Sequence, residues 1–257
     1  MFKVYETELA GRKLTIETGK FANQANGSVT VRYGDTVVMT NVTASKEPRD
    51  GVDFFPLSVD YEEKLYAVGR IPGSFNRREG KPADKAILIS RAIDRPIRPL
   101  FPHDFRNDVC VVNTVLSMDQ DCSPEVCANI GTSAALSISD IPWAGPTAAV
   151  QVGYVNDEII INPTEEQRKN NRLRLTVAGT EEKITMIEAG ADEIPNGIML
   201  EAIKKAHVEI KKLCGFIKNI KDEIGKPKFE YQSFSVTPEF YKAVCDKFEQ
   251  AMYEGVQ

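Results

Sequence analysis

The chain of 257 residues has a formal net charge of −5, a hydrophobic fraction of 42% and a charged fraction of 27%, which are ordinary values for a globular protein with a sizeable buried core. It contains no run of about 18 apolar residues that could span a bilayer, and no apolar stretch follows the first residues as a secretory signal requires. Five cysteines without a C-x-x-C pair argue against a disulfide framework and a zinc site, and favour a reducing, cytoplasmic setting.

The first sixty residues predict β structure. Residues 14–18 and 28–33 alternate between apolar and polar side chains, and residues 36–43 are rich in β-branched side chains. Because a Gly-Asp dipeptide separates the last two runs, we expect them to form a β-hairpin. A further strand is expected over residues 54–61.

A loop is predicted over residues 69–82, where two prolines and three glycines occur without an apolar period. Positive charge is concentrated around this loop, since residues 70–106 hold nine Lys or Arg and four Asp or Glu. That segment is therefore +5 and the rest of the chain −10. A basic zone on an acidic body is typical of a protein that binds a polyanion. A solvated charged face gives the same pattern, so charge alone leaves both interpretations open.

A helix is expected next, over residues 83–94, and it would place Arg91 and Arg95 four residues apart on one face. Prolines then recur at every third position, which favours an extended, polyproline-like path over residues 95–102. On such a path Arg95 and Arg98 would point the same way, with little conformational freedom left to lose.

The rest of the chain alternates strands and helices. A strand over residues 108–118 precedes a helix over residues 123–139, whose Ser-Pro-Glu start supplies an N-cap and a first-turn proline. A long helix is expected over residues 197–223, and another begins at Thr237. Four further strands are expected at residues 148–154, 158–162, 173–178 and 183–188. This order predicts an α+β domain followed by the beginning of a helical region.

Several strings resemble the polynucleotide phosphorylase family. They are PGSFNRREGKP at residues 72–82 and IDRPIRPLFP at 93–102, with GSV at 27–29, GDT at 34–36 and VAGT at 177–180. The resemblance implies the first of two RNase PH-like repeats, a βαβ domain of the ribosomal protein S5 domain 2-like kind. Residues 1–145 would form its first part, residues 146–226 its C-terminal part, and residues 227–257 the truncated start of an all-helical linker domain.

The resemblance also implies the activity of a parent enzyme. That enzyme would be a 3'-to-5' phosphorolytic exoribonuclease and polymerase of mRNA degradation, in which inorganic phosphate attacks single-stranded RNA and releases nucleoside diphosphates. It would use magnesium, work in the cytoplasm and assemble as a homotrimer. The alternative, with the same fold, is a stand-alone, non-catalytic RNA-binding subunit of an exosome-type ring.

The resemblance places catalysis outside this chain. In the family's second repeat two aspartates and a lysine precede the VAG string, and the corresponding positions here hold Arg168, Arg174 and Thr176. Magnesium needs oxygen ligands, which arginine cannot supply. We therefore expect no catalytic and no metal-binding residue in this chain, and magnesium bound by the absent second repeat. This repeat would bind RNA and scaffold the ring.

The candidate RNA-binding residues fall into two groups. Phe75, Arg77 and Arg78 match the family's RNA-contacting loop motif, although Asn76 stands where a second phenylalanine is usual. Single-strand binders combine such aromatic stacking with cationic contacts to phosphate. The second group, which the resemblance places near the RNA path or the neighbouring repeat, is Arg91, Arg95 and Arg98. The structural alternative for this group is an ion-pair network with Asp94 or Asp104.

Overall fold

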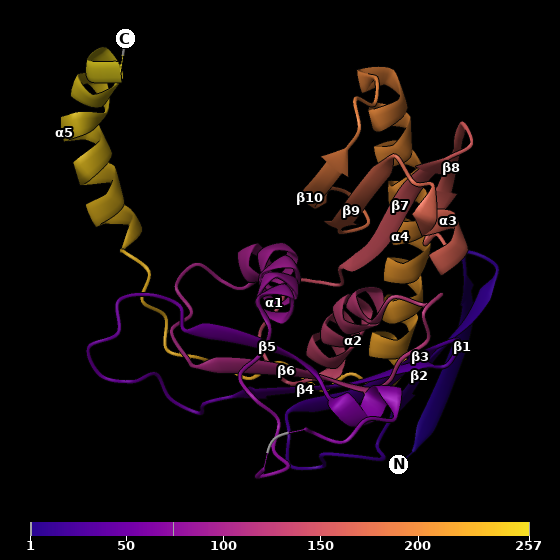
Figure 1. Cartoon of the computed structure of the whole chain (residues 1–257). Helices are drawn as coiled ribbons and strands as arrows, with labels where there is room; N and C mark the ends of the chain where they lie inside the picture. Colours follow the sequence, from indigo (N-terminus) through magenta and orange to yellow (C-terminus); the bar gives the residue numbers. More distant parts are fainter. Residues whose placement is uncertain (1, 74, 257) are drawn as a thin grey trace.

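Two β-sheets and the helices packed between and beside them make up the body of the chain (Figure 1). The computed structural model describes residues 2–73 and 75–256. The first sheet has six strands in the order β1-β2-β3-β4-β6-β5, and the second has four in the order β10-β9-β7-β8. The first-sheet strands are β1 (Lys3–Leu9), β2 (Arg12–Thr18), β3 (Gly27–Tyr33), β4 (Thr36–Ala44), β5 (Leu57–Glu63) and β6 (Val109–Ser117). The second-sheet strands are β7 (Ala148–Val155), β8 (Glu158–Ile161), β9 (Leu173–Gly179) and β10 (Ile184–Ala191).

The predicted hairpin is confirmed, since β3 and β4 pair antiparallel around a turn in which Gly34 has a φ of +57°. This left-handed conformation favours glycine. A second hairpin, β1–β2, was not singled out from the sequence. The predicted βαβ element is also present, because β5 runs parallel to β6 and helix α1 (Asp84–Ile97) lies between them in the chain. The predicted α+β fold is therefore confirmed.

Helix α2 (Pro124–Ile138) is central to the core. All its residues except Glu125 are buried, and it packs against β3 and β4 of the first sheet, β7 of the second sheet and helix α4 (Asn196–Ile224). A Cβ at Gly131 would lie 2.5 Å from Thr40 Oγ1, so this glycine is required for close packing of the helix on the sheet. One hydrophobic cluster includes buried side chains from both sheets, and the two sheets therefore share a core.

The expectation of an extended path over residues 95–102 is wrong. Helix α1 continues through Pro96 to Ile97, and a 3₁₀ helix, η2 (Arg98–Leu100), follows directly. Proline at this point removes one backbone hydrogen bond, but its fixed φ suits a helix. Burial of Pro96 and Ile97 offsets that loss. Prolines three residues apart match a 3₁₀ helix as well as polyproline II, so their spacing could not separate the two conformations.

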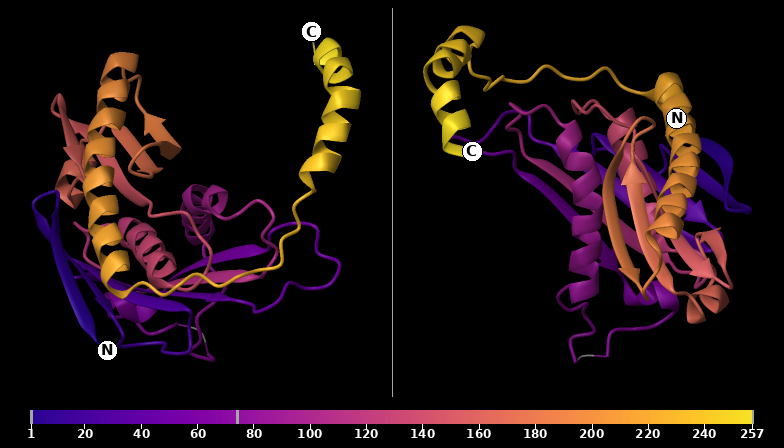
Figure 2. Two further views of the ribbon diagram at one scale, coloured as in Figure 1. Left: turned by 180° about the vertical axis from the view of Figure 1, so that it is seen from behind. Right: turned by 90° about the horizontal axis from the view of Figure 1, so that it is seen from above.

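The chain after α4 forms a strap over the body, residues 225–236, before helix α5 (Pro238–Val256) (Figure 2). The ammonium group of Lys228 donates to the carbonyl oxygens of Leu136, Ser137 and Ser139 at the end of α2. Such contacts satisfy carbonyl groups that have no partner within their helix. Helix α5 itself has no buried residue and projects away from the body in both views. The helix predicted to begin at Thr237 is thus confirmed.

The strap is also held by aromatic contacts and by one carboxylate. Phe229 and Tyr231 pack on Phe105, with ring centroids 6.2 and 5.0 Å away. The carboxylate of Asp104 accepts hydrogen bonds from the hydroxyl groups of Tyr231, Ser233 and Ser235. These three bonds, that of Ser233 above all, lower the pKa of Asp104 to about 2. Along the described residues, no helix combines the length and the apolar character that a membrane crossing requires.

Candidate functional site

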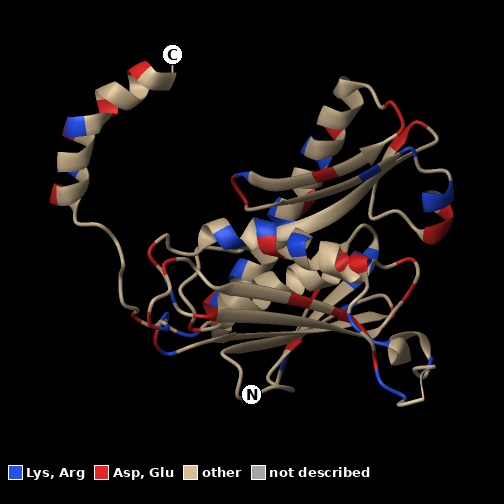
Figure 3. Ribbon diagram, turned by 60° about the vertical axis from the view of Figure 1, so that its left-hand side comes forward, with Lys and Arg blue, Asp and Glu red and all other residues tan. Residues whose placement is uncertain are grey.

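The first candidate site is the arginine loop, residues 69–82, which lies between a short 3₁₀ helix, η1 (Leu65–Val68), and α1. Phe75 is fully exposed in this loop, with a relative accessibility of 101%. Arg77 and Arg78 are exposed as well, and neither guanidinium group has a hydrogen-bond or ion-pair partner among the described residues. The loop extends beyond the sheet on the side away from α2, with its basic residues near the tip (Figures 1 and 3).

Helix α1 carries the next two candidates. Arg91 and Arg95 are four residues apart and both exposed, so the expected shared face exists. Figure 3 shows basic residues along this helix. Two helical turns separate Arg91 from Arg98, a rise of about 10 Å. The structure thus distributes the six candidates over the loop, the middle of α1 and its C-terminal end, and does not gather them in one pocket.

Arg98 has intramolecular partners. Its Nε and Nη2 atoms donate to the two carboxylate oxygens of Asp94, at 2.9 and 2.8 Å. The guanidinium group also donates to the carbonyl oxygens of Phe55 and Leu57 and lies 5.9 Å from the centroid of the Phe55 ring. Of the two proposed acidic partners, Asp94 pairs with Arg98, whereas Asp104 is engaged by the strap.

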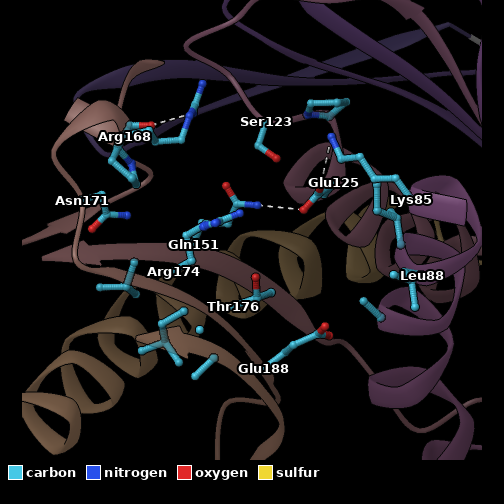
Figure 4. A pocket seen from close by; sticks show the side chains of 18 of the residues that line it. Lys85, Leu88, Ser123, Glu125, Gln151, Arg168, Asn171, Arg174, Thr176 and Glu188 are labelled. Atoms are coloured by element: carbon cyan, nitrogen blue, oxygen red, sulfur yellow. Dashed lines mark hydrogen bonds and ion pairs between the residues drawn. The ribbon is translucent and has the colours of Figure 1, made fainter. Parts of the chain in front are cut away.

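The second candidate site is a cavity of about 800 Å³ between α1, the start of α2 and the face of the second sheet (Figure 4). Cross-strand pairing builds its floor, because Thr176 of β9 lies opposite Gln151 of β7 and Glu188 of β10. Arg174, two residues from Thr176, therefore shares the same face. Lys85 of α1 and Glu125 of α2 line the side of the cavity opposite this floor.

Glu125 is the most buried carboxylate of this cavity, and burial raises its pKa. The nearby Lys85 ammonium opposes the rise, at 3.9 Å from Oε1, while Glu63 and Glu188 add to it. Gln151 Nε2 donates to Glu125 Oε2 at 2.8 Å and also favours the ionised form. The cavity thus carries both signs of charge on opposed walls.

The donors present in the cavity do not fit magnesium. The three positions expected from the sequence are all in its lining, but Arg168 and Arg174 bring positive charge, which would repel a cation. The guanidinium group of Arg168 already donates hydrogen bonds to the carbonyl oxygens of Pro163 and Gln120. Among the described residues no three His, Cys, Asp or Glu side chains are grouped as a metal site requires.

Sequence reasoning missed four polar residues of this cavity. Lys85, Glu125, Gln151 and Glu188 come from four elements far apart in the chain, α1, α2, β7 and β10, and none belongs to a motif. In the sequence, Glu125 is distinctive only as part of the Ser-Pro-Glu helix start. The alternation of β7 and β10 indicates which side chains share a face, but the pairing of those strands with β9 depends on long-range contacts that the sequence pattern does not give.

Two family matches cover most of the chain. Residues 10–142 match domain 1 of the 3' exoribonuclease family, and residues 145–209 match its domain 2.

Curated relatives of high identity are named polyribonucleotide nucleotidyltransferase. The relative from Ruminiclostridium cellulolyticum is 63% identical over 244 residues, which cover 95% of this chain and 35% of the relative. The relative from Caldicellulosiruptor saccharolyticus is 56% identical over 255 residues, covering 99% of this chain and 36% of that protein. The chain thus spans about a third of the length of the curated relatives it matches.

Solved structures share the fold at low sequence identity. Rice (Oryza sativa) Rrp46 superimposes with a TM-score of 0.62 at 15% identity, over 86% of this chain and 94% of Rrp46. An Archaeoglobus fulgidus exosome chain, from a structure with RNA bound to the active site, gives a TM-score of 0.61 at 20% identity. That match covers 79% of this chain and 87% of the exosome chain.

Proposed function

Because this chain belongs to the 3' exoribonuclease family, we propose that it forms part of a 3'-to-5' phosphorolytic exoribonuclease and polymerase that acts on single-stranded RNA. In the proposed reaction, an oxygen of inorganic phosphate attacks the terminal phosphodiester, the bond to the preceding nucleotide breaks, and a nucleoside diphosphate leaves. The high identity to proteins named polyribonucleotide nucleotidyltransferase supports this choice.

Within that enzyme, the role we assign to this chain is RNA binding. The observation that carries the assignment is the arginine loop, which presents a fully exposed Phe75 beside Arg77 and Arg78, two guanidinium groups without partners among the described residues. Phosphorolysis depends on holding a polyanion in place, and cationic groups together with an aromatic face suit that task. Arg91 and Arg95 would extend the contact along α1. Arg98 we assign instead to holding the end of α1.

The chemical step itself we assign to residues outside this chain. The cavity combines Arg174 and Lys85 with Glu125 and Glu188, and its donors do not suit a magnesium ion. Magnesium, which the family resemblance implies, would be held by a second repeat, and the parent enzyme would form a homotrimer in the cytoplasm and act in mRNA degradation. Residues 1–145 and 146–226 would be the two parts of the repeat, and residues 227–257 the start of a helical domain.

The second candidate function is that of a stand-alone RNA-binding subunit of an exosome-type ring. One observation supports it, namely that rice Rrp46 and an Archaeoglobus fulgidus exosome chain share the fold, with TM-scores of 0.62 and 0.61. Identity favours the first candidate, at 63% against 15%.

A kinetic experiment on the full-length protein tests the proposed function. The substrates are a homopolymer RNA and inorganic phosphate, and the readout is release of nucleoside diphosphate. We expect Arg77→Ala with Arg78→Ala to raise KM for RNA, and Glu125→Gln with Glu188→Gln to leave kcat within about twofold, since the cavity holds no reacting group. A fall of kcat by about 100-fold in the second variant would move catalysis into this chain, because such a loss is typical of removing a general acid or base.

A further inference from the structure

Among the described residues of the arginine loop, one besides its ends is hydrogen-bonded to the body. Glu79 Oε1 accepts a hydrogen bond from the backbone amide of Leu65 at 2.9 Å. Leu65 is the first residue of η1, and the preceding residue, Lys64, provides no side-chain cap. The first amides of any helix lack partners within it. Glu79, fourteen residues further along the chain, therefore supplies the acceptor that the local sequence lacks.

Helix η1 is a suitable support for this contact. Ala67 packs against the main hydrophobic cluster. At the C-terminal end Gly69 has a φ of +69°, and its amide donates to Tyr66, while the Arg70 amide donates to Leu65. The arginine loop therefore leaves the body at one end of η1, and Glu79 ties it back to the other end.

The position of Glu79 is otherwise difficult to explain. It follows Arg77 and Arg78 directly, and a carboxylate there repels the phosphate groups that those residues would bind. The pKa of a neighbouring lysine indicates where the Glu79 carboxylate lies. The pKa of Lys64 is raised, mainly by its hydrogen bond with Glu62 and in part by the charge of Glu79. The Glu79 carboxylate thus lies near Lys64 and η1.

We propose that Glu79 is a positioning residue, which holds Arg77 and Arg78 in place for RNA phosphates by binding the amide of Leu65. This inference rests on the proposed function, since it assigns a purpose to the loop that binds RNA. With the bond made, the chain after Arg77 and Arg78 is held at Glu79, and without it the next fixed point is the start of α1 at Asp84. A shorter free segment loses less conformational entropy when RNA binds.

Two substitutions at the same position separate the hydrogen bond from the charge. Glu79→Gln and Glu79→Ala both remove the negative charge, but only glutamine keeps an acceptor oxygen at the right distance. By charge alone, both variants of the full-length protein would bind single-stranded RNA more tightly than the wild type. If the hydrogen bond to Leu65 holds the loop, Glu79→Gln binds RNA at least as tightly as the wild type. Glu79→Ala then binds RNA about fivefold more weakly than Glu79→Gln, which is the effect expected from one hydrogen bond.

A second measurement reports the anchor directly. Hydrogen exchange at the Leu65 amide is expected to accelerate in Glu79→Ala and to stay near the wild-type rate in Glu79→Gln. Melting temperatures of the two variants should agree, because Glu79 is exposed. Equal RNA affinities in the two variants, or equal exchange at Leu65, would overturn the inference.

The double variant Arg77→Ala with Arg78→Ala distinguishes failure of this inference from failure of the proposed function. If that double variant weakens RNA binding while the two Glu79 variants bind equally, the loop binds RNA without the anchor. If the double variant binds RNA as the wild type does, the RNA-binding role of the loop itself is wrong.

Discussion

Asp94 and Arg98, which lie one helical turn apart, form a bidentate ion pair with N–O distances of 2.8 and 2.9 Å. The same guanidinium group reaches across to the carbonyl oxygens of Phe55 and Leu57 at the start of β5. Arg98 therefore joins the end of α1 to the edge strand of the first sheet. A planar group with several donors can do this, whereas an ammonium group cannot make the same set of bonds.

Removal of the Arg98 side chain should lower the stability of the fold and leave RNA affinity little changed. Arg98→Ala is expected to reduce the free energy of unfolding by about 1 kcal/mol, the size of a partly exposed ion pair with added hydrogen bonds. Arg95→Ala is the matched control, because Arg95 is exposed and has no partner among the described residues. Thermal denaturation measures the difference. Equal melting temperatures for the two variants, with an RNA affinity lowered only in Arg98→Ala, would contradict the structural role.

Glu125 should make stability depend on pH. Its folded-state pKa is raised by burial, so the ionised form is disfavoured in the folded protein, and this contribution to stability is present below the unfolded pKa and lost as pH rises. Glu125→Gln should therefore be more stable than the wild type near pH 7, and the difference should vanish below about pH 4, under the ordinary range of a glutamate. Urea denaturation at several pH values measures this.

The hydrogen-bond partner of Glu125 supplies the control. Gln151→Ala removes the donor to Oε2, so ionisation should become more costly and the loss of stability with rising pH steeper than in the wild type. Identical pH profiles for the wild type and both variants would show that Glu125 is ionised as easily as in water.

The part of the strap that Asp104 holds, residues 231–235, should loosen in acid. The pKa of Asp104 is lowered to about 2 from 3.8 by the hydroxyl groups of the strap, so its contribution is present above about pH 4 and lost as pH falls from there towards 2. Hydrogen exchange of the amides in residues 231–235 should accelerate as the pH falls through that interval. In Asp104→Asn the exchange should be faster than in the wild type at neutral pH, and it should no longer change between about pH 4 and pH 2. Asp108→Asn is the control, because its carboxylate pairs with Arg49 and not with the strap. Equal protection in Asp104→Asn and the wild type would contradict this role.

Much of the fold could be predicted from local patterns. Alternation and the Gly-Asp turn indicated the β3–β4 hairpin, and the expected bounds of α2 and α4 agree with the structure within one or two residues. The segment after Arg95 was predicted incorrectly because burial of Pro96 and Ile97, a tertiary effect, decides between two conformations with three residues per turn. The sequence pattern of that segment fits both.

The site was less accessible to prediction. Motif residues such as Arg77 were found because they are consecutive in the chain, and their exposure agrees with a binding loop. The sequence could not decide whether Arg98 pairs with Asp94 or with Asp104, because both are close to it in the chain. Only the structure shows that the strap binds Asp104 and that Asp94 is the partner of Arg98. The cavity floor depends on the register of three strands, which a single sequence does not fix.

The RNA-binding role of the arginine loop is tested most directly by the salt dependence of RNA affinity. For the full-length protein we expect a plot of log K against log salt concentration to lose about 1.4 units of slope when Arg77 and Arg78 are both changed to alanine, at about 0.7 per phosphate contact for single strands. An unchanged slope would mean that neither guanidinium group meets a phosphate, which would contradict the RNA-binding role assigned to Arg77 and Arg78.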